Sequence, residues 1–135
     1  MDQIEINALR GLRVLIAEDD FLIGGAMREI LIDLECEVVG PIGDLAEVLR
    51  TIQTGGIDAA LLDVQLGQAN VLPAANELAA RGIPFILTTG RTNLADLPGL
   101  LLNAPLLTKP FDAPRLEMTM RGAFLAPVAI APGGV

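Results

Sequence analysis

The sequence contains no histidine, the side chain that most often acts as a general base and as a nitrogen ligand for metals. Serine–histidine and cysteine–histidine nucleophiles are therefore excluded, as is any imidazole metal site. Tryptophan and tyrosine are also absent, so neither ring can stack on a flavin. Chemistry in this chain must use carboxylates, hydroxyls and lysine.

Cysteine and basic residues are scarce. The single cysteine, Cys36, cannot form an internal disulfide, and its apolar neighbours predict a small core residue. Nine Lys and Arg residues against 17 Asp and Glu residues give a formal net charge of −8. The basic residues are spread along the chain and form no patch that would neutralise phosphates, so we expect no direct binding to nucleic acid.

Long apolar runs are missing although 52% of the residues are hydrophobic. No run approaches the roughly 20 residues that a membrane span needs, and the N-terminus lacks the pattern of a secretory signal. We therefore expect a cytoplasmic protein that does not contact a membrane. A chain of 135 residues is predicted to form one domain whose core needs neither disulfides nor a structural metal.

From Leu12 onward the chain repeats one pattern five times: a short apolar run, a turn, and a stretch with helical spacing. The apolar runs cover residues 12–17, 36–39, 57–62, 84–88 and 106–108. Apolar strands that are each followed by a helix indicate a parallel sheet covered on both faces. With right-handed crossovers, this pattern predicts a doubly wound five-stranded α/β sandwich.

Local signals set the expected boundaries of the elements. The first helix should bury the face that carries Ile23, Met27, Ile30 and Leu34. The second strand should end at Gly40-Pro41, and the second helix should begin after Asp44 and end at Gly55-Gly56. We expect residues 1–11 to form an N-terminal extension, residues 12–125 the folded domain, and residues 126–135 a flexible tail.

Polar side chains follow the ends of the predicted strands. They are Glu18, Asp19 and Asp20 after the first strand, Asp63 after the third, Thr88 and Thr89 at the fourth, and Lys109 after the fifth. Each alone is commonly an ordinary solvated residue. Because the carboxyl ends of parallel strands meet at one edge of a sheet, the joint pattern indicates a site there.

The chemistry of such a site follows from its charges. Carboxylates about 4 Å apart repel by roughly 4 kcal/mol at an effective dielectric constant near 20, and a divalent cation relieves this repulsion. Ligands that are all oxygen favour Mg²⁺, often together with a phosphate. Asp63 would then act as a nucleophile in phosphoryl transfer, while Mg²⁺ and Lys109 balance charge and Thr89 donates a hydrogen bond.

This order of an acidic pair, an aspartate, a Thr-Gly pair and a Lys-Pro-Phe segment resembles the receiver domain of two-component response regulators over residues 12–125. The resemblance implies a flavodoxin-like fold in which Mg²⁺ is bound by Glu18, Asp19, Asp63 and the backbone carbonyl of Gln65. It also implies that Asp20 is a further acidic position next to the metal-binding pair.

The same resemblance assigns the phosphoryl group and its contacts. It implies that Asp63 accepts the phosphoryl group, that Thr89 before Gly90 is the switch hydroxyl, and that Lys109 pairs with the new charge. Pro110 should follow Lys109 through a cis peptide bond. Thr88 stays open as the alternative switch residue, because alternation along the strand places the two threonines on opposite faces.

The sequence also departs from the family pattern. Leu106 stands where many receivers have an aromatic residue three positions before the lysine, and Phe85 and Phe111 are expected in the core instead. Arg91 stands where a related group of single-domain receivers has an aromatic residue. The segment between Thr89 and Lys109 is short and contains Asn93, Pro98, Gly99 and Pro105, which predicts a curtailed fourth helix.

The leading hypothesis is a phosphorylation switch without an output domain, since the residues after Phe124 are too few to fold one. A histidine kinase or histidine phosphotransfer protein would phosphorylate Asp63, and a downstream protein or a second copy of the chain would bind in response. Exposed leucines near the fourth helix would serve that contact: Leu94, Leu97, Leu100 and Leu101. The chain would assist its own phosphorylation and dephosphorylation without being an enzyme for other substrates.

Two alternatives come from other classes. A receiver-like interaction module that works without phosphorylation is suggested by Leu106 and the altered loop. A Mg²⁺-dependent phosphohydrolase of the haloacid dehalogenase type is disfavoured, because it needs a second aspartate where Gln65 stands and a cap domain for which there is no room. A flavin site is disfavoured because the loops lack a phosphate-binding run of Ser, Thr and Gly.

Overall fold

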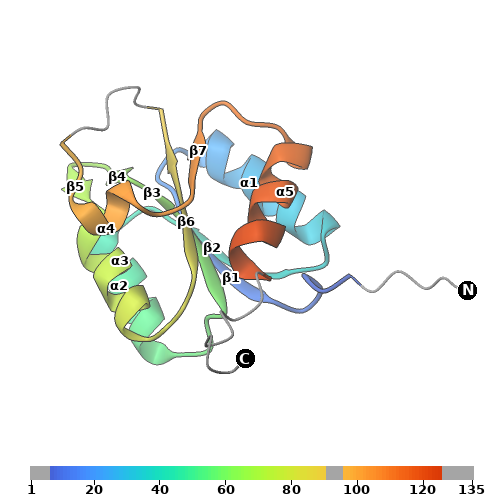
Figure 1. Cartoon of the computed structure of the whole chain (residues 1–135), viewed down its shortest axis with the longest axis horizontal. Coiled ribbons are helices and arrows are strands. Elements are labelled where there is room, and N and C mark those ends of the chain that lie inside the picture. Colours follow the sequence, from blue (N-terminus) through green and yellow to red (C-terminus); the bar gives the residue numbers. More distant parts are fainter. Residues whose placement is uncertain (1–6, 91–95, 126–135) are drawn as a thin grey trace, which may run out of the picture.

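The computed structural model describes residues 7–90 and 96–125, which form a parallel sheet between two layers of helices (Figure 1). The sheet has five strands: β1 (Arg13–Ala17), β2 (Glu37–Ile42), β3 (Ala59–Asp63), β6 (Phe85–Thr89) and β7 (Leu106–Thr108). The helices are α1 (Phe21–Asp33), α2 (Leu45–Thr54), α3 (Leu72–Ala80), α4 (Gly99–Leu102) and α5 (Ala113–Phe124).

The strands lie in the order β2-β1-β3-β6-β7, and every neighbouring pair is parallel. The chain therefore runs from β1 to one neighbour, β2, and then returns to β3 on the other side of β1. The predicted fold class is confirmed. This reversal next to β1 matters for function, because ligands of such sheets bind outside the carboxyl ends of the strands where the order reverses.

Alternating side chains of the strands build two cores, one on each face of the sheet. Leu15, Leu62 and Leu87 face the layer of α2, α3 and α4, whereas Ile16, Leu61 and Ile86 face the layer of α1 and α5. This alternation follows from the two-residue period of a strand. Burial on both faces explains why the strand sequences are apolar throughout.

Several boundaries agree with the local sequence signals. The Asp44 carboxylate caps α2 by accepting from the backbone N–H of Glu47, and the helix ends at Gly55, whose φ is 94°. Only glycine adopts such an angle without strain. The cysteine is buried as predicted. Leu9, within the predicted N-terminal extension, is fully buried among the side chains between the sheet and α1 and α5.

The predicted end of the second strand at Gly40-Pro41 is wrong, because β2 continues through these residues to Ile42. The two residues are joined by a cis peptide bond. Proline is tolerated here because β2 is an edge strand, where a missing N–H leaves no ladder partner unpaired. The register between β1 and β2 shifts between Leu15 and Ala17, opposite this segment.

The predicted apolar face of α1 is confirmed, because its four residues contact one core cluster. Met27 and Leu31 are buried, whereas Ile23, Ile30 and Leu34 are only partly buried. Gly24, which has no side chain, is also buried and lies against Pro41 of β2. At the start of α1, Phe21 and Leu22 are exposed by 89% and 78%.

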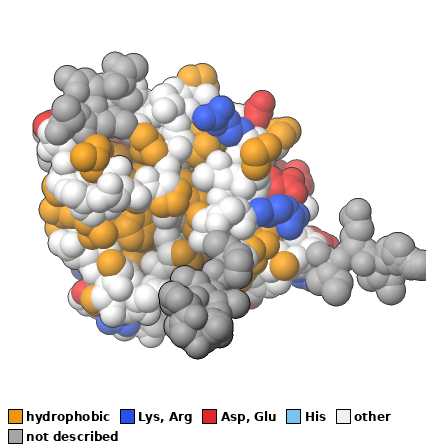
Figure 2. Space-filling view, in the orientation of Figure 1, with side chains coloured by type: hydrophobic (Ala, Val, Ile, Leu, Met, Phe, Trp, Pro, Cys, Tyr) orange, Lys and Arg blue, Asp and Glu red, His pale blue; other side chains and the backbone are white. Residues whose placement is uncertain are grey.

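The fourth helix is curtailed, as predicted, and α4 has four residues. The predicted patch of exposed leucines is wrong for Leu97 and Leu101, which are buried against the sheet. The prediction is confirmed for Leu100, and Leu102 is exposed as well. Figure 2 shows hydrophobic side chains gathered over this part of the surface. The positions of Arg91, Asn93 and Leu94 lie outside the described residues. No described helix has the length and apolar character that crossing a membrane requires.

The contact between α1 and β2 leads to a prediction about two adjacent glycines. A Cβ atom on Gly24 would lie 2.8 Å from two atoms of the rigid Pro41 ring, whereas one on Gly25 would meet nothing within 4 Å. We expect Gly24→Ala to lower the free energy of unfolding by about 1–3 kcal/mol, as overpacked core substitutions do. The matched Gly25→Ala should raise it by up to about 1 kcal/mol through helix propensity. Urea unfolding of both variants distinguishes them, and equal effects would contradict this packing.

Candidate functional site

The site lies at the carboxyl ends of β1, β3 and β7. Glu18 and Asp19 directly follow β1, and Asp63 is the last residue of the adjacent β3. Lys109 follows β7 and is held there by a 2.7 Å hydrogen bond from its backbone N–H to the carbonyl of Thr89. The strand order therefore brings together residues that are up to 91 positions apart in the chain.

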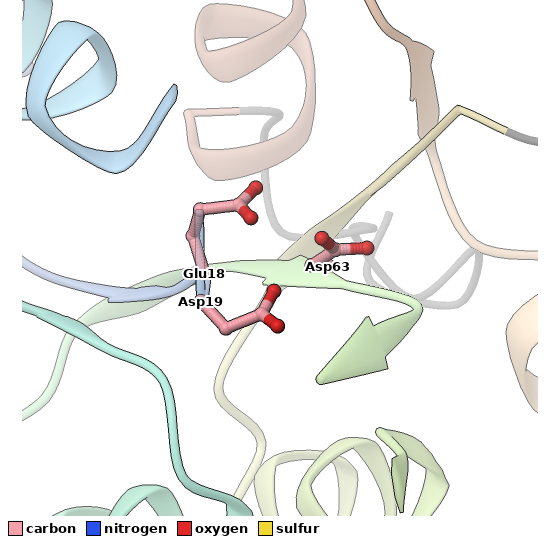
Figure 3. A group of neighbouring side chains, drawn as sticks. All are labelled: Glu18, Asp19 and Asp63. Atoms are coloured by element: carbon pink, nitrogen blue, oxygen red, sulfur yellow. The ribbon is translucent and has the colours of Figure 1, made fainter. Parts of the chain in front are cut away.

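Three carboxylates converge in this place, and Figure 3 shows them directed toward a common space. One oxygen from each of Glu18, Asp19 and Asp63 lies within 4.8 Å of the others. Glu18 and Asp63 are buried, whereas Asp19 is exposed. A small set of hard oxygen donors with an open, hydrated side suits Mg²⁺, which usually keeps several water ligands. The residues present thus fit the predicted metal.

Lys109 is the only lysine of the chain, and its ammonium group bridges the two buried carboxylates. Its Nζ atom donates to Glu18 Oε1 and to Asp63 Oδ2, both at 2.7 Å. Burial lowers the pKa of Lys109, but the hydrogen bonds to Asp63 and Glu18 outweigh this effect and raise its pKa above the ordinary value of 10.5. Lys109 is therefore a permanent positive charge in the site.

The environment of Glu18 makes its ionised form less favourable than in water. Burial raises its pKa above 4.5, against the opposing hydrogen bonds from Lys109 and from the backbone N–H of Asp20. The neighbouring charge of Asp63 raises the pKa of Glu18 further. A divalent cation between these carboxylates would stabilise the ionised forms, because its positive charge replaces the stabilisation by water that burial removes.

The two oxygens of Asp63 have different hydrogen-bond partners. Oδ2 accepts from Lys109, and Oδ1 accepts from the backbone N–H of Gln65 at 3.1 Å. Gln65 lies in β4 (Gln65–Leu66), which pairs with β5 (Ala69–Asn70) in a small hairpin that the sequence did not predict. The proposed role of the Gln65 carbonyl as a metal ligand stays a prediction.

The hairpin contributes a contact that sequence reasoning missed. The backbone N–H of Gly67 donates to Asp19 Oδ2 at 3.0 Å, and the Gln65 side chain donates to the Gly67 carbonyl at 3.0 Å. Gly67 has a φ of 57°. A glycine in a turn carries no sequence signal for a contact 48 positions away.

Asp20 does not belong to the converging group. Its Oδ1 atom caps α1 by accepting from the backbone N–H groups of Leu22 and Ile23, at 2.9 and 3.0 Å. The cap orients the first turn of the helix directly after the metal-binding pair. Its contribution to the site is thus to position the chain.

The other residues predicted for the site lie at the ends of β6 and β7. Thr88 and Thr89 are both buried at the end of β6, and Gly90 follows them at the surface. The Lys109-Pro110 peptide bond is cis, as the resemblance implied. Which threonine acts as the switch stays a prediction.

An apolar groove of about 550 Å³ begins beside Lys109 and runs along α1. Its lining comes from α1 and from the segments after β6 and β7: Leu22, Ile23, Ala26, Met27, Ile30, Gly90, Lys109, Pro110 and Phe111. Phe111 packs partly against the core, as predicted, and also forms part of this wall. A partner that binds the groove would contact Lys109 directly.

Comparison with known proteins identifies similar chains. Residues 14–121 match the family model of the response regulator receiver domain. The response regulator protein PmrA of Pseudomonas aeruginosa is 34% identical over 82% of this chain and 51% of its own length. The chain thus spans about half the length of the curated relatives it matches. The predicted absence of an output domain stays a prediction.

Solved structures show the same fold. SdrG from Sphingomonas melonis Fr1 has a TM-score of 0.72 and 35% identity, covering 82% of this chain and 93% of that chain. The receiver domain of the sensor histidine kinase PA1611 from Pseudomonas aeruginosa PAO1 has a TM-score of 0.71 and 24% identity, covering 82% of this chain and 96% of that chain. At this lower identity the second likeness concerns the fold alone.

Proposed function

Because this chain belongs to the response regulator receiver domain family, we propose that it is a phosphorylation switch whose acceptor is Asp63. One observation carries the proposal: three carboxylates from β1 and β3 converge, and Lys109 donates to two of them at 2.7 Å. This arrangement combines a nucleophile, a place for a divalent cation and a second positive charge. Phosphoryl transfer needs little more from a protein than such positioning and charge balance.

In the proposed reaction a carboxylate oxygen of Asp63 attacks the phosphorus of a phosphohistidine. A P–O bond forms, the P–N bond breaks, and the nitrogen leaves with the electron pair. Lys109 stays charged throughout and pairs with the phosphoryl oxygens once Asp63 Oδ2 or Oδ1 has become the bridging oxygen of the acyl phosphate. The backbone N–H of Gln65 holds the carboxylate in place during the attack.

Glu18, Asp19 and Asp63 would hold Mg²⁺, with the Gln65 carbonyl as a further ligand. When bound, the cation neutralises the charge that develops on the phosphoryl group. The PA1611 receiver domain is described with a magnesium ion coordinated in its active-site cleft. The convergence of the three carboxylates in this chain supports the same assignment.

The partner that supplies the phosphoryl group would be a histidine kinase or a histidine phosphotransfer protein. The apolar groove along α1 supports this, since it opens beside Lys109 and is lined in part by Leu22, which is 78% exposed. Phe21, the preceding residue in the sequence, is 89% exposed. An apolar helix face of the partner would cover these side chains and bring its phosphohistidine to Asp63. A downstream protein or a second copy would then bind the phosphorylated form.

We class the chain as a phosphoacceptor that assists its own phosphorylation and dephosphorylation, and not as an enzyme acting on other substrates. Its location in the cytoplasm stays a prediction. The interaction module that works without phosphorylation is the alternative that would replace this proposal if Asp63 accepted no phosphate.

The test uses a small-molecule phosphodonor. We expect acetyl phosphate with Mg²⁺ to add one phosphate to the wild type, measured by intact mass, and none to Asp63→Asn. Asp58→Asn is the matched control, because Asp58 lies just before β3 and its exposed carboxylate only accepts from the backbone N–H of Arg13. Equal labelling of Asp63→Asn and the wild type, or no labelling of the wild type, would refute the proposal.

A further inference from the structure

The Thr88 hydroxyl is buried without a partner. The residue has no exposed surface, and within the described part of the chain its Oγ1 atom is the one buried side-chain oxygen or nitrogen that lacks a hydrogen bond. A buried hydroxyl without a partner costs free energy, which valine, of nearly the same shape, would avoid. A buried group without a partner calls for an explanation, and a functional role is one of the recognised ones.

The sheet register places Thr88 beside the acceptor. Thr88 of β6 is the direct Cα partner of Asp63 of β3, and its carbonyl accepts from the N–H of Val64 at 3.0 Å. Neighbouring parallel strands in register direct paired side chains to the same face. The Thr88 side chain therefore lies on the face of Asp63, which is the face of α1 and α5.

The same register relates Thr88 to Lys109. Thr88 is the Cα partner of Leu107 in β7, and Lys109 follows Leu107 by two residues. Leu107 packs on the face of α1 and α5, so the strand period assigns Thr88 and Lys109 to one face. Thr89 is assigned to the opposite face by the same rule. Of the two threonines, Thr88 is therefore the one whose side chain lies on the same face of the sheet as Asp63.

In the unphosphorylated chain both carboxylate oxygens of Asp63 already accept hydrogen bonds, from Gln65 and from Lys109. Phosphorylation adds strong acceptor oxygens at this place, and Lys109 alone cannot saturate them. We propose that the Thr88 hydroxyl donates a hydrogen bond to the phosphorylated Asp63 side chain, a contact distinct from the switch role that the family resemblance implies for Thr89. The inference rests on the proposed function, because it requires a phosphoryl group on Asp63.

The test measures binding of beryllium trifluoride, a phosphoryl analogue, in the presence of saturating Mg²⁺. We expect Thr88→Val to bind it about tenfold or more weakly than the wild type, as the loss of a hydrogen bond to a charged group implies. Thr88→Ser keeps the hydroxyl and should bind like the wild type. Without the analogue, the melting temperature of Thr88→Val should equal or exceed that of the wild type, because no hydrogen bond is lost.

The outcomes separate the inference from the proposed function. If Thr88→Val binds beryllium trifluoride as tightly as the wild type, or if Thr88→Ser binds as weakly as Thr88→Val, the role of Thr88 is refuted. If the wild type binds no better than Asp63→Asn, the phosphoacceptor role itself fails. A Thr88→Val variant that does not fold would also count against the inference, because it would mean that the hydroxyl is already satisfied in the resting protein.

Discussion

Replacing Lys109 by methionine is expected to lower the free energy of unfolding by about 3 kcal/mol at pH 7 without metal, as removal of one partner from a buried ion pair does. Methionine keeps the apolar stem and removes only the charge. The Lys109 side chain is 16% exposed, and its ammonium group bridges Glu18 and Asp63, whose side chains are 1% and 10% exposed. Its loss leaves two buried negative charges that repel each other.

The loss of unfolding free energy in Lys109→Met should become smaller as the pH falls from 7 toward 5. Lys109 lowers the pKa of Glu18, which burial already raises above 4.5, so the variant raises the pKa of Glu18 further. A carboxyl group whose pKa is raised in the folded state contributes stability that is full below its unfolded pKa and is lost as the pH rises through the folded pKa. Protonated Glu18 therefore relieves the repulsion in the variant at lower pH.

Urea unfolding in EDTA at pH 7 and pH 5 measures both effects. Arg81→Met is the matched control, because its ion pair with Glu77 is surface exposed, with side chains 38% and 32% accessible, and should contribute about 0.3–0.5 kcal/mol. A second substitution, Asp63→Asn, should restore part of the stability lost in Lys109→Met. If Lys109→Met and Arg81→Met have equal effects, the ammonium group does not neutralise the buried carboxylates.

Mg²⁺ is expected to stabilise the wild type strongly. At a concentration 100 times its dissociation constant, binding to the folded state alone adds about 2.7 kcal/mol to the free energy of unfolding. Asp19→Asn should weaken Mg²⁺ binding by about tenfold or more, since it removes one of three negative ligands. The fold should persist, because an asparagine oxygen can still accept from the backbone N–H of Gly67.

Asp20→Asn provides the control on the next residue. Asparagine caps helices as well as aspartate does, and the Asp20 oxygen serves as the cap of α1 and not as a member of the converging group. Its Mg²⁺ affinity should therefore stay close to that of the wild type. Thermal unfolding across a Mg²⁺ titration compares the three proteins. If Asp19→Asn and Asp20→Asn lowered the Mg²⁺ affinity equally, Asp19 would act only through the general surface charge and not as a metal ligand.

Much of the fold was predictable because it depends on local patterns. Alternation of apolar strands and amphipathic helices predicted all five sheet strands, and Asp44 and Gly55 marked the ends of α2 through their own capping geometry. The path of β2 through Pro41 was not predictable in this way. Proline usually ends a strand, and its tolerance depends on whether that strand lies at the edge of the sheet.

The chemical groups of the site were also readable from the sequence, since each follows a predicted strand and the absence of histidine limited the alternatives. Their contacts were not. The sequence treated Glu18, Asp19 and Asp20 as a series, whereas in the structure one pairs with Lys109, one accepts from Gly67 and one caps α1. Three adjacent backbone positions point their side chains in different directions, and each neighbour comes from another part of the chain.

By itself, the sequence determined the five strands of the main sheet, the helices that alternate with them, and which acidic, hydroxyl and amino groups follow the strands, because these properties depend on neighbouring residues. Only the tertiary structure decided that β3 lies beside β1, that Lys109 bridges two buried carboxylates and that Thr88, whose buried hydroxyl lacks a partner, is the strand neighbour of Asp63. Such distances depend on strand order and register, which are set by the packing of the whole sheet and its two helical layers.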